Sequence, residues 1–280
     1  MKLLLPALAL TAAPAFAEQH TNPEVTLTRL DCGQIRVNDL NLFSDVRDYT
    51  GESRDLVGSC YLIKHGEEYM LWDTGLPAGL LNAEQNDSDT LSPTLTVTIA
   101  DQLAELDLTP ADIKMIGISH YHFDHLGQAA EFPEAELVIQ KADWDVLSAD
   151  ELPAFAGGFA DPSLVQPWLD GGTVTTVTGD HDVFGDGTVQ MIDMPGHTPG
   201  HAALLVQLPE AGPILLSGDA VHFEEQIGND GVPTFNVDRA DTLASIARMT
   251  QLADNLGATL IIQHDARDVN KLPDFPNAAK

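Results

Sequence analysis

The sequence predicts an α/β fold in which helices flank packed β-sheets. Short apolar segments bounded by glycine, proline or aspartate recur along the chain, which is typical of strands. Two longer segments, residues 94–106 and 241–256, carry the spacing of apolar residues expected of helices. The strands gather in two halves that helices close, and elements with one apolar side have to pack as layers. No repeat, linker or low-complexity tract in the sequence indicates a second domain.

The expected elements follow one another in a clear order. In the first half they are a strand at 25–30, a hairpin of strands at 58–63 and 69–72, a helix at 94–106, strands at 115–118 and 136–139, and a helix that begins near Ala142. In the second half they are strands at 173–177, 189–192, 202–206 and 214–216, a helix at 241–256, and a last strand at 259–262. Residues 33–56 are polar and turn-rich, so we expect turns there.

The first 17 residues are typical of a bacterial secretory signal. Lys2 precedes an apolar run at 3–13, and the small residues Ala15 and Ala17 offer a cleavage site. No segment approaches the roughly 20 apolar residues that a membrane span needs. We therefore expect 1–17 to be removed, and residues 18–280 to form a single domain that is periplasmic or secreted and has no membrane partner.

The formal net charge of −30 is too large to ignore. A surface this acidic repels nucleic acid and anionic lipid, so we exclude polyanionic partners. Two interpretations remain open: a well-solvated surface suited to a salty medium, or a surface that attracts cations or cationic substrates. Bound metal ions would offset part of the negative charge near a site.

The sequence contains two cysteines, Cys32 and Cys60. An oxidising compartment would permit them to form a disulfide, provided that their Cα atoms lie within bridging distance. Alternatively, they are two small buried apolar residues on neighbouring strands. The sequence alone leaves both interpretations open.

The strongest chemical signal lies directly after the expected strand at 115–118. His120, His122, Asp124 and His125 place three imidazoles and a carboxylate within six residues. Alternate side chains of an extended chain share a face, so His120 and His122 can converge on one ion. If the chain then turns into a helix, Asp124 and His125 can face a second ion close by.

Three further ligand candidates follow other expected strands. His197 comes after the strand at 189–192, Asp219 after the one at 214–216, and His264 after the last strand. Functional residues gather where strand ends meet loops, so these positions agree with one shared site. Imidazole and carboxylate without thiolate suit zinc, and also cobalt, iron or manganese.

The HxHxDH segment, the later Gly-His-Thr-Pro-Gly-His at 196–201, the Gly-Asp at 218–219 and the final His264 together resemble the metallo-β-lactamase superfamily. The resemblance covers nearly all of residues 18–280. It implies an αββα sandwich made of two similar halves, which the order of strands and helices is compatible with but does not derive.

The resemblance also implies a ligand set for two divalent metal ions, most often Zn²⁺. One ion would be held by three histidines and the other by Asp124 and two histidines, while Asp219 and a hydroxide would bridge them. The two groups of ligands are His120, His122 and His197, and Asp124, His125 and His264. Such a pair of ions activates water for the hydrolysis of esters or amides. Asp124 would double as a proton shuttle.

Within the superfamily, the chain is most similar to N-acyl homoserine lactonases, which open a lactone ring in quorum quenching. The segments that carry this resemblance are 30–33, 41–43, 132–133 leading into 138–141, and 263–265. The substrate would be a small lactone or ester, and the resemblance allows a homodimer. A zinc β-lactamase or a general arylesterase is the alternative, although true zinc β-lactamases generally lack a bridging aspartate. A binding or sensor protein that has lost activity is a further alternative.

One position departs from the lactonase pattern. Such enzymes often have a tyrosine three residues after the bridging aspartate, positioned to hydrogen-bond the substrate carbonyl, and here that residue is His222. Neutral imidazole can donate the same kind of bond. The alternative is a histidine at the surface or behind the metal ligands.

Other residues have weaker claims. Asp73 matches a superfamily position that supports the metal ligands, but it could equally cap a turn. His201 is expected to be structural, because the ligand positions are already filled. Apolar bulk that could line an acyl-chain pocket, or could equally form a cluster beneath a long loop, comes from Phe155, Phe159, Trp168 and Phe223.

Overall fold

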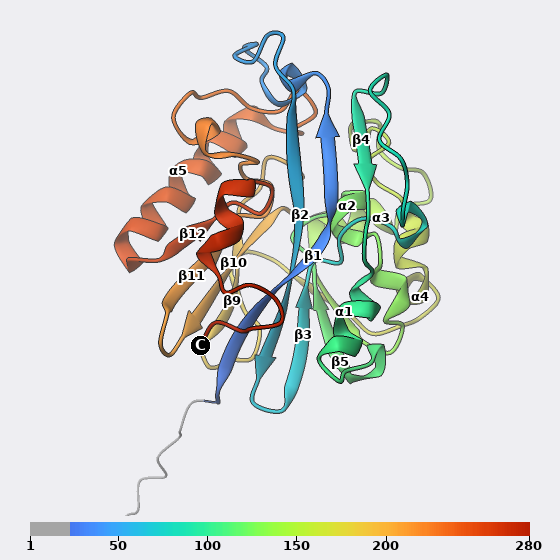
Figure 1. Ribbon diagram of the computed structural model, residues 1–280, viewed down its shortest axis with the longest axis vertical. Helices are drawn as coiled ribbons and strands as arrows, with labels where there is room; N and C mark the ends of the chain where they lie inside the picture. The colour runs from blue at the N-terminus through green and yellow to red at the C-terminus, as the bar shows by residue number, and fades with distance from the viewer. Residues whose placement is uncertain (1–22) are drawn as a thin grey trace, which may run out of the picture.

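The computed structural model describes residues 23–280 and consists of two β-sheets packed face to face, with helices on both outer sides (Figure 1). The predicted αββα arrangement is therefore confirmed. The expected secretory signal at 1–17 lies outside the described residues. Within the described residues, no helix is long and apolar enough to cross a membrane.

In the described part of the chain, the first sheet has seven strands and the second has five. The first sheet runs in the order β4 (Leu91–Thr94), β1 (Val25–Val37), β2 (Arg54–His65), β3 (Glu68–Trp72), β5 (Ile113–Gly117), β6 (Glu136–Gln140) and β7 (Val174–Val177). The second runs in the order β12 (Thr259–Ile261), β11 (Gly212–Leu216), β10 (Ala202–Leu208), β9 (Val189–Asp193) and β8 (His181–Asp182). Parallel pairing of β3, β5, β6 and β7 gives these strands a common carboxyl end.

The helices lie on opposite outer faces of the two sheets. The first sheet is covered by α1 (Ile99–Glu105), α2 (Phe123–Leu126), α3 (Lys141–Leu147) and α4 (Gln166–Leu169), and the second by α5 (Arg239–Leu256) (Figure 1). The side chain of Asp238 caps α5 by accepting a bond from the backbone N–H of Asp241, and Gly257 ends the helix with a φ of 62°.

The core follows the layers. Between the sheets, Trp72, Met70, Leu204 and Leu216 are fully buried, and they belong to one apolar cluster. A second cluster fills the space between the first sheet and α1–α4, and a third the space between the second sheet and α5. Burial on both faces explains why many of these strands are continuous apolar runs.

The first two strands are longer than the sequence predicts. β1 continues through residues 33–37 and β2 begins at Arg54, so both ends of the turn-rich segment 33–56 belong to strands. The register of the pair shifts between Asp31 and Gln34, and Gly33 has a φ of 111°. This irregularity interrupts the alternation of apolar and polar residues by which a strand is recognised in a sequence.

The helix expected at 94–106 is shorter than predicted. Leu91–Thr94 forms the edge strand β4, and Pro93 is tolerated there because an edge strand does not need every N–H. The helix begins after Thr98, whose hydroxyl accepts from the backbone of Asp101 while the Asp101 carboxylate accepts from that of Thr98. This capping box sets the start of α1.

The two cysteines are bonded to each other across β1 and β2. Their Cα atoms lie 5.8 Å apart, and both side chains are fully buried. The backbone of Cys32 also accepts a hydrogen bond from Leu76 N at 3.2 Å. The disulfide therefore ties β1 to β2, and the Cys32 carbonyl connects this pair to the segment after β3.

We predict that a Cys32→Ala/Cys60→Ala double variant unfolds with a free energy about 2–4 kcal/mol lower than the parent, because the bond restricts the unfolded chain. Denaturant unfolding with and without reductant measures this. Reductant is expected to destabilise only the parent. A double variant as stable as the oxidised parent would contradict the prediction.

Candidate metal centre

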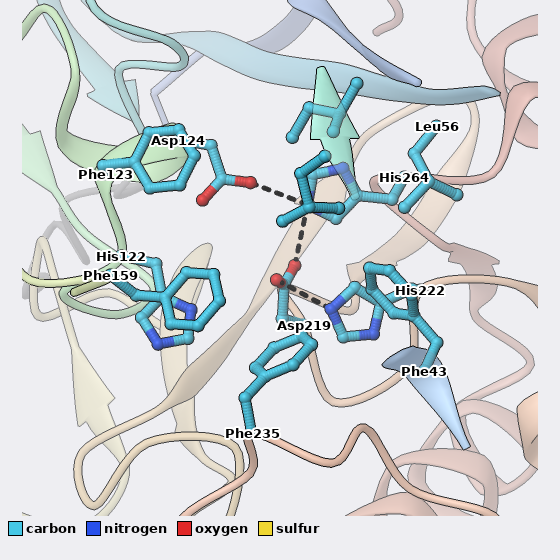
Figure 2. A pocket seen from close by; sticks show the side chains of 12 residues that line it. Phe43, Leu56, His122, Phe123, Asp124, Phe159, Asp219, His222, Phe235 and His264 are labelled. Carbon is cyan, nitrogen blue, oxygen red and sulfur yellow. Dashed lines mark ion pairs between the residues drawn. The ribbon is translucent and has the colours of Figure 1, made fainter. Parts of the chain in front are cut away.

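The candidate site lies where strand ends from both sheets meet. The loop after β5 carries His120 and His122, and the turns after β9, β11 and β12 carry His197, Asp219 and His264. In Figure 2, side chains from these separate elements point toward one another at the floor of a pocket. The structure thus brings together all seven residues predicted as ligands.

The loop after β5 has the predicted change from extended chain to helix. His122 is extended, with φ −69° and ψ 150°, and precedes the first turn of α2. Asp124 and His125 lie in that turn, on a different side from His120 and His122. Gly127 follows with its Cα against the backbone of Gly75 and Leu76, where a Cβ would have no space.

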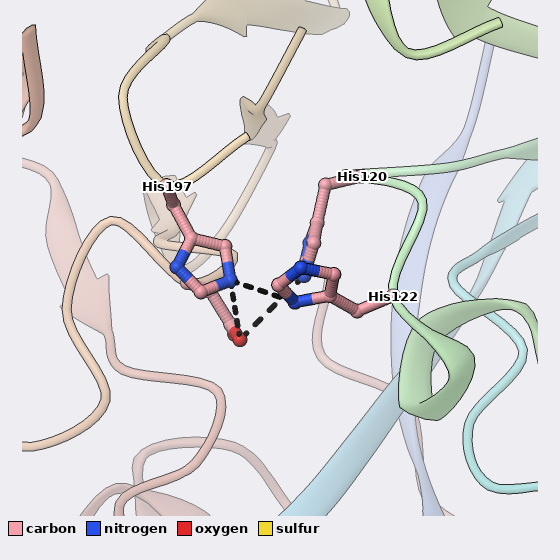
Figure 3. Close-up of side chains that lie close together, drawn as sticks. His120, His122 and His197 are labelled. Carbon is pink, nitrogen blue, oxygen red and sulfur yellow. Dashed lines mark hydrogen bonds and ion pairs between the residues drawn. The ribbon is translucent and has the colours of Figure 1, made fainter. Parts of the chain in front are cut away.

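The first donor set consists of His120, His122, His197 and Asp219, all of them buried (Figure 3). The Nε2 atom of His197 lies 3.0 Å from Nδ1 of His122 and 3.4 Å from Oδ2 of Asp219. The Nε2 atom of His120 lies 3.6 Å from the same oxygen. Three imidazole nitrogens and one carboxylate oxygen therefore face a common point.

The second donor set consists of Asp124, His125, His264 and the same Asp219. The Nε2 atoms of His125 and His264 lie 3.3 Å apart, and 3.3 Å and 3.1 Å from Oδ1 of Asp219. Oδ2 of Asp124 lies 3.6 Å from Nε2 of His264. Asp219 therefore presents one oxygen to each set, which is the arrangement of a bridging carboxylate.

The chemistry of both sets fits divalent cations. Within each set, every donor atom lies within 4.8 Å of the others. Five buried side-chain atoms of the described residues have no hydrogen-bond partner, and two of them, His120 Nε2 and Asp219 Oδ1, belong to the donor sets. Buried polar atoms are costly without a partner, and a cation between the donors would supply one.

The second ring nitrogen of four of these histidines is already hydrogen-bonded. The contacts are His120 Nδ1 to Ser119 Oγ at 3.0 Å, His125 Nδ1 to Asp73 Oδ2 at 2.9 Å, His197 Nδ1 to Asn236 Oδ1 at 2.8 Å, and His264 Nδ1 to the Val57 carbonyl at 2.7 Å. Such partners fix the ring orientation and leave Nε2 free to bind a metal.

Asp73 contacts the proposed metal ligand His125, which agrees with the supporting role predicted for it. Its carboxylate is fully buried and accepts from the backbone N–H of Ser119 at 2.7 Å, from the Ser119 hydroxyl at 2.9 Å and from His125. Its φ of 59° is uncommon for a non-glycine residue. These contacts hold His125 and the start of the ligand loop together.

Burial sets the charge of the two donor sets. It lowers the pKa of His120 and His122 well below the ordinary histidine value, and the neighbouring imidazoles lower it further. Both rings are therefore neutral at pH 7 and keep a lone pair for a cation. Burial also opposes protonation of His125, but Asp219 and Asp73 outweigh it and raise its pKa. The second set contains two carboxylates, those of Asp124 and Asp219, whereas the first contains only that of Asp219.

His201 lies outside both donor sets, in agreement with the structural role predicted for it. Its Nδ1 donates to the Met194 carbonyl at 2.9 Å, and its Nε2 accepts from the backbone N–H of Asp219 at 2.7 Å. Burial lowers its pKa to about 3, so the ring stays neutral. Both nitrogens are used to hold the turn that carries Asp219.

His222 is buried at the edge of the metal centre, so the alternative that it is a surface histidine is wrong. Its Nε2 lies 3.0 Å from Oδ2 of Asp219, and the ring of Phe43 packs edge-on against it at 4.7 Å (Figure 2). Burial lowers the pKa of His222, and the ring is neutral with a single N–H. Its backbone N–H donates to Gln226 Oε1 at 2.6 Å, which fixes the residue.

An apolar pocket opens above the two donor sets (Figure 2). Its walls combine aliphatic and aromatic side chains, and its floor is formed by ligand residues and His222. The apolar lining residues are Ile35, Phe43, Leu56, Leu91, Phe123, Phe159 and Phe235. Phe159 is held in place because its carbonyl accepts from the backbone N–H of Phe123 at 2.9 Å.

Of the four apolar residues predicted for this pocket, only Phe159 lines it. Phe155 is 48% exposed, and Trp168 is buried beneath the first sheet, where its Nε1 donates to the Ala135 carbonyl. Phe223 is buried under Arg54, which lies 4.3 Å above its ring. These three assignments are wrong because side-chain direction in loops has no sequence period.

Three other aromatic residues line the pocket and were not identified from the sequence, namely Phe43, Phe123 and Phe235. Phe123 could have been found, because it lies inside the HxHxDH segment. Phe43 and Phe235 come from opposite ends of the chain, and their rings meet at 5.5 Å only after the layers have packed. No local pattern connects them.

Known proteins resemble the chain in sequence and in fold. An N-acyl homoserine lactonase AttM from Rhizobium radiobacter is 34% identical over 184 residues, which cover 62% of this chain and 68% of that protein. An N-acyl homoserine lactonase from a Bacillus species is 30% identical over 233 residues, covering 81% and 88%. A solved N-acyl homoserine lactone hydrolase with N-hexanoyl-L-homoserine at its catalytic metal centre superposes with a TM-score of 0.77 at 23% identity, covering 92% and 100%.

The family model described as the metallo-beta-lactamase superfamily matches residues 53–264. That range contains both donor sets, from His120 to His264, together with Asp73 and His222. The chain belongs to the metallo-beta-lactamase superfamily.

Proposed function

We propose that this protein is a metal-dependent hydrolase that opens the ring of N-acyl homoserine lactones, and that it uses two zinc ions. The observation that carries the proposal is the pair of donor sets sharing Asp219 beneath an apolar pocket. The relatives named as N-acyl homoserine lactonases support the substrate class. A zinc β-lactamase or general arylesterase is less well supported, because neither name occurs among these relatives.

Each donor set holds one ion in this proposal. His120, His122 and His197 hold the first, Asp124, His125 and His264 hold the second, and Asp219 joins the two. Four-coordination by nitrogen and oxygen suits zinc. When bound, paired divalent ions lower the pKa of a water molecule and polarise the ester carbonyl.

Asp124 is the residue best placed to move a proton. Its side chain is 12% exposed, whereas that of Asp219 is 3% exposed, and it lines the pocket while remaining 3.6 Å from His264. The attacking water forms a bond to the carbonyl carbon and gives up a proton. Asp124 passes this proton to the ring oxygen as the ester C–O bond breaks, which yields a hydroxyl group and a carboxylic acid. The acid then releases its own proton to solvent and becomes a carboxylate.

His222 supplies a neutral hydrogen-bond donor beside the reacting carbonyl. The lowered pKa of His222 keeps one N–H on its ring without adding a positive charge. In the structure, Nε2 lies 3.0 Å from Oδ2 of Asp219, so this N–H faces the carboxylate and would be released for the substrate carbonyl once Asp219 binds a metal ion. A donor fixed by burial and by the Gln226 contact stabilises negative charge on the carbonyl oxygen without having to reorganise. It takes the place that tyrosine occupies in the lactonase pattern.

The aromatic walls accept the acyl chain of the substrate. Phe43, Phe159 and Phe235 surround the pocket with apolar surface, with ring centroids 4.9 Å apart for Phe159 and Phe235. No lysine or arginine belongs to the lining within the described residues. An uncharged hydrocarbon chain is therefore favoured there over a charged group.

The proposal extends to location and assembly. We propose export to the periplasm or beyond, supported by the composition of residues 1–17 and by the buried disulfide, which an oxidising compartment maintains. The mature hydrolase domain would comprise residues 18–280. A homodimer remains a proposal that rests on the family resemblance alone.

We predict that purified protein of residues 18–280 opens hexanoyl and decanoyl homoserine lactones and contains about two zinc ions per chain. Chelation should abolish turnover, and added zinc should restore it. Product chromatography with metal analysis of the same sample measures both. Two zinc ions without lactone opening would reject the substrate class, and full turnover without metal would reject the mechanism.

Substitution of Asp124 by Asn is predicted to lower kcat by about 10²–10⁴-fold at saturating zinc, because the amide cannot carry the proton. Asp112→Asn is the control, since Asp112 caps a distant surface turn. Steady-state kinetics with metal analysis would compare the two. An Asp124→Asn variant with two metals and full turnover would reject the shuttle.

Truncation of the pocket wall is predicted to affect long acyl chains more than short ones. In Phe159→Ala, kcat/KM for decanoyl homoserine lactone should fall about tenfold, equivalent to about 1.4 kcal/mol, and less for the butanoyl substrate. Phe155→Ala in the same loop is the control, because Phe155 is outside the pocket. Equal losses on both substrates would remove the acyl-chain role.

A further inference from the structure

Gln263 is a buried polar residue that the proposed mechanism does not use. It follows β12, lies directly before His264, and is 1% exposed. Burial of an uncharged amide is costly unless its donors and acceptors all find partners. The contacts of Gln263 therefore reveal what it holds in place.

The side-chain amide of Gln263 makes four hydrogen bonds, two at its oxygen and two at its nitrogen. Oε1 accepts from the Gly218 N–H at 2.9 Å and from Trp72 Nε1 at 3.2 Å. Nε2 donates to Asp73 Oδ2 at 3.0 Å and to the Ser59 carbonyl at 3.3 Å. The two donors and two acceptors around it allow only this orientation of the amide.

These partners belong to opposite halves of the sandwich. Ser59 lies in β2 and Trp72 ends β3, both in the first sheet, and Asp73 follows β3. Gly218 follows β11 and Gln263 follows β12, both in the second sheet. The amide thus bonds across the seam between the sheets at the level of the metal centre.

Two of these partners, Asp73 and Gly218, are directly connected to a metal ligand. Asp73 bonds to His125 Nδ1, and Gly218 directly precedes Asp219 in the chain. Gln263 itself precedes His264, and its backbone N–H donates to the Ser217 hydroxyl at 3.2 Å. The three ligands His125, Asp219 and His264 therefore share one amide behind them.

We propose that Gln263 is a positioning residue that sets the distance between the two halves of the metal centre. Because its amide bonds to both Asp73 and Gly218, Gln263 fixes the position of His125 relative to Asp219. His264 is constrained as well, because it directly follows Gln263 in the chain. This inference rests on the metal centre of the proposed function. It does not depend on which ester is hydrolysed.

The test compares Gln263→Met with Gln102→Met. Methionine keeps the length of the side chain and removes its polar atoms. Gln102 is a matched control, because its buried amide also bonds to backbone through both its oxygen and its nitrogen. It accepts from Asp31 N at 2.8 Å and donates to the Asp31 carbonyl at 2.8 Å, and none of its hydrogen bonds goes to a metal ligand. Zinc affinity is measured by chelator competition, alongside thermal unfolding with and without zinc, and cobalt-substituted protein reports ligand geometry by its visible spectrum.

In Gln263→Met, the zinc dissociation constants should rise about 10–100-fold and kcat should fall, while KM changes little. The cobalt spectrum should also change. Gln102→Met should lose thermal stability but keep parental zinc affinity and cobalt spectrum. Equal zinc affinity and equal spectra in the two variants would overturn the proposal.

Gln263→Glu provides a second, independent variant. Glutamate keeps an acceptor for Gly218 and Trp72 but places an oxygen where the amide donated to Asp73. Weaker zinc binding is again expected, and parental affinity would overturn the proposal even if Gln263→Met fails to fold. Since zinc titration uses no lactone, failure of the parent to open lactones would reject the proposed substrate and leave this test intact.

Discussion

The carboxylate of Asp219 is buried among five imidazole rings, those of His120, His125, His197, His222 and His264, each with a nitrogen within 3.6 Å of one of its oxygens. An ionised carboxylate removed from water costs several kcal/mol unless it is paired. Burial alone would raise the pKa of Asp219, whereas the surrounding histidines lower it well below its usual value. The rest of the centre is arranged around the charge of Asp219. Each proposed metal ligand would share a cation with this carboxylate.

The layered fold is what makes that arrangement possible. A single strand end supplies His120 and His122, but the sharing of Asp219 needs strand ends from both sheets at one level. Two contacts hold the strand ends of the second sheet at the metal centre: the His201 ring accepts from the backbone of Asp219, and the Gln263 amide bonds to both sheets. The distance between the strand ends of the two sheets is set by the packed apolar layers, because a close-packed core tolerates little displacement.

Much of the ligand set could be predicted from sequence because its chemistry is local. The HxHxDH segment places four ligand-type side chains together whatever the rest of the chain does. The positions of His197, Asp219 and His264 directly after expected strands add three more candidates, and the resemblance to a family divides the ligands between two ions. The ring partners Asn236 and Val57, the Gln263 amide and the wall residues Phe43 and Phe235 could not be predicted, since they meet only through sheet packing. The extension of β1 was hidden for a different reason, because the register shift at Asp31 and Gln34 breaks the strand period.

The most direct test of the account is a crystal structure of the zinc-loaded protein with anomalous diffraction recorded at the zinc absorption edge. The account predicts two anomalous peaks roughly 3.5–4 Å apart, one beside each oxygen of Asp219. One peak would lie among His120, His122 and His197, and the other among Asp124, His125 and His264. A single peak, or two peaks that do not share Asp219, would contradict the central claim that this carboxylate joins two metal ions.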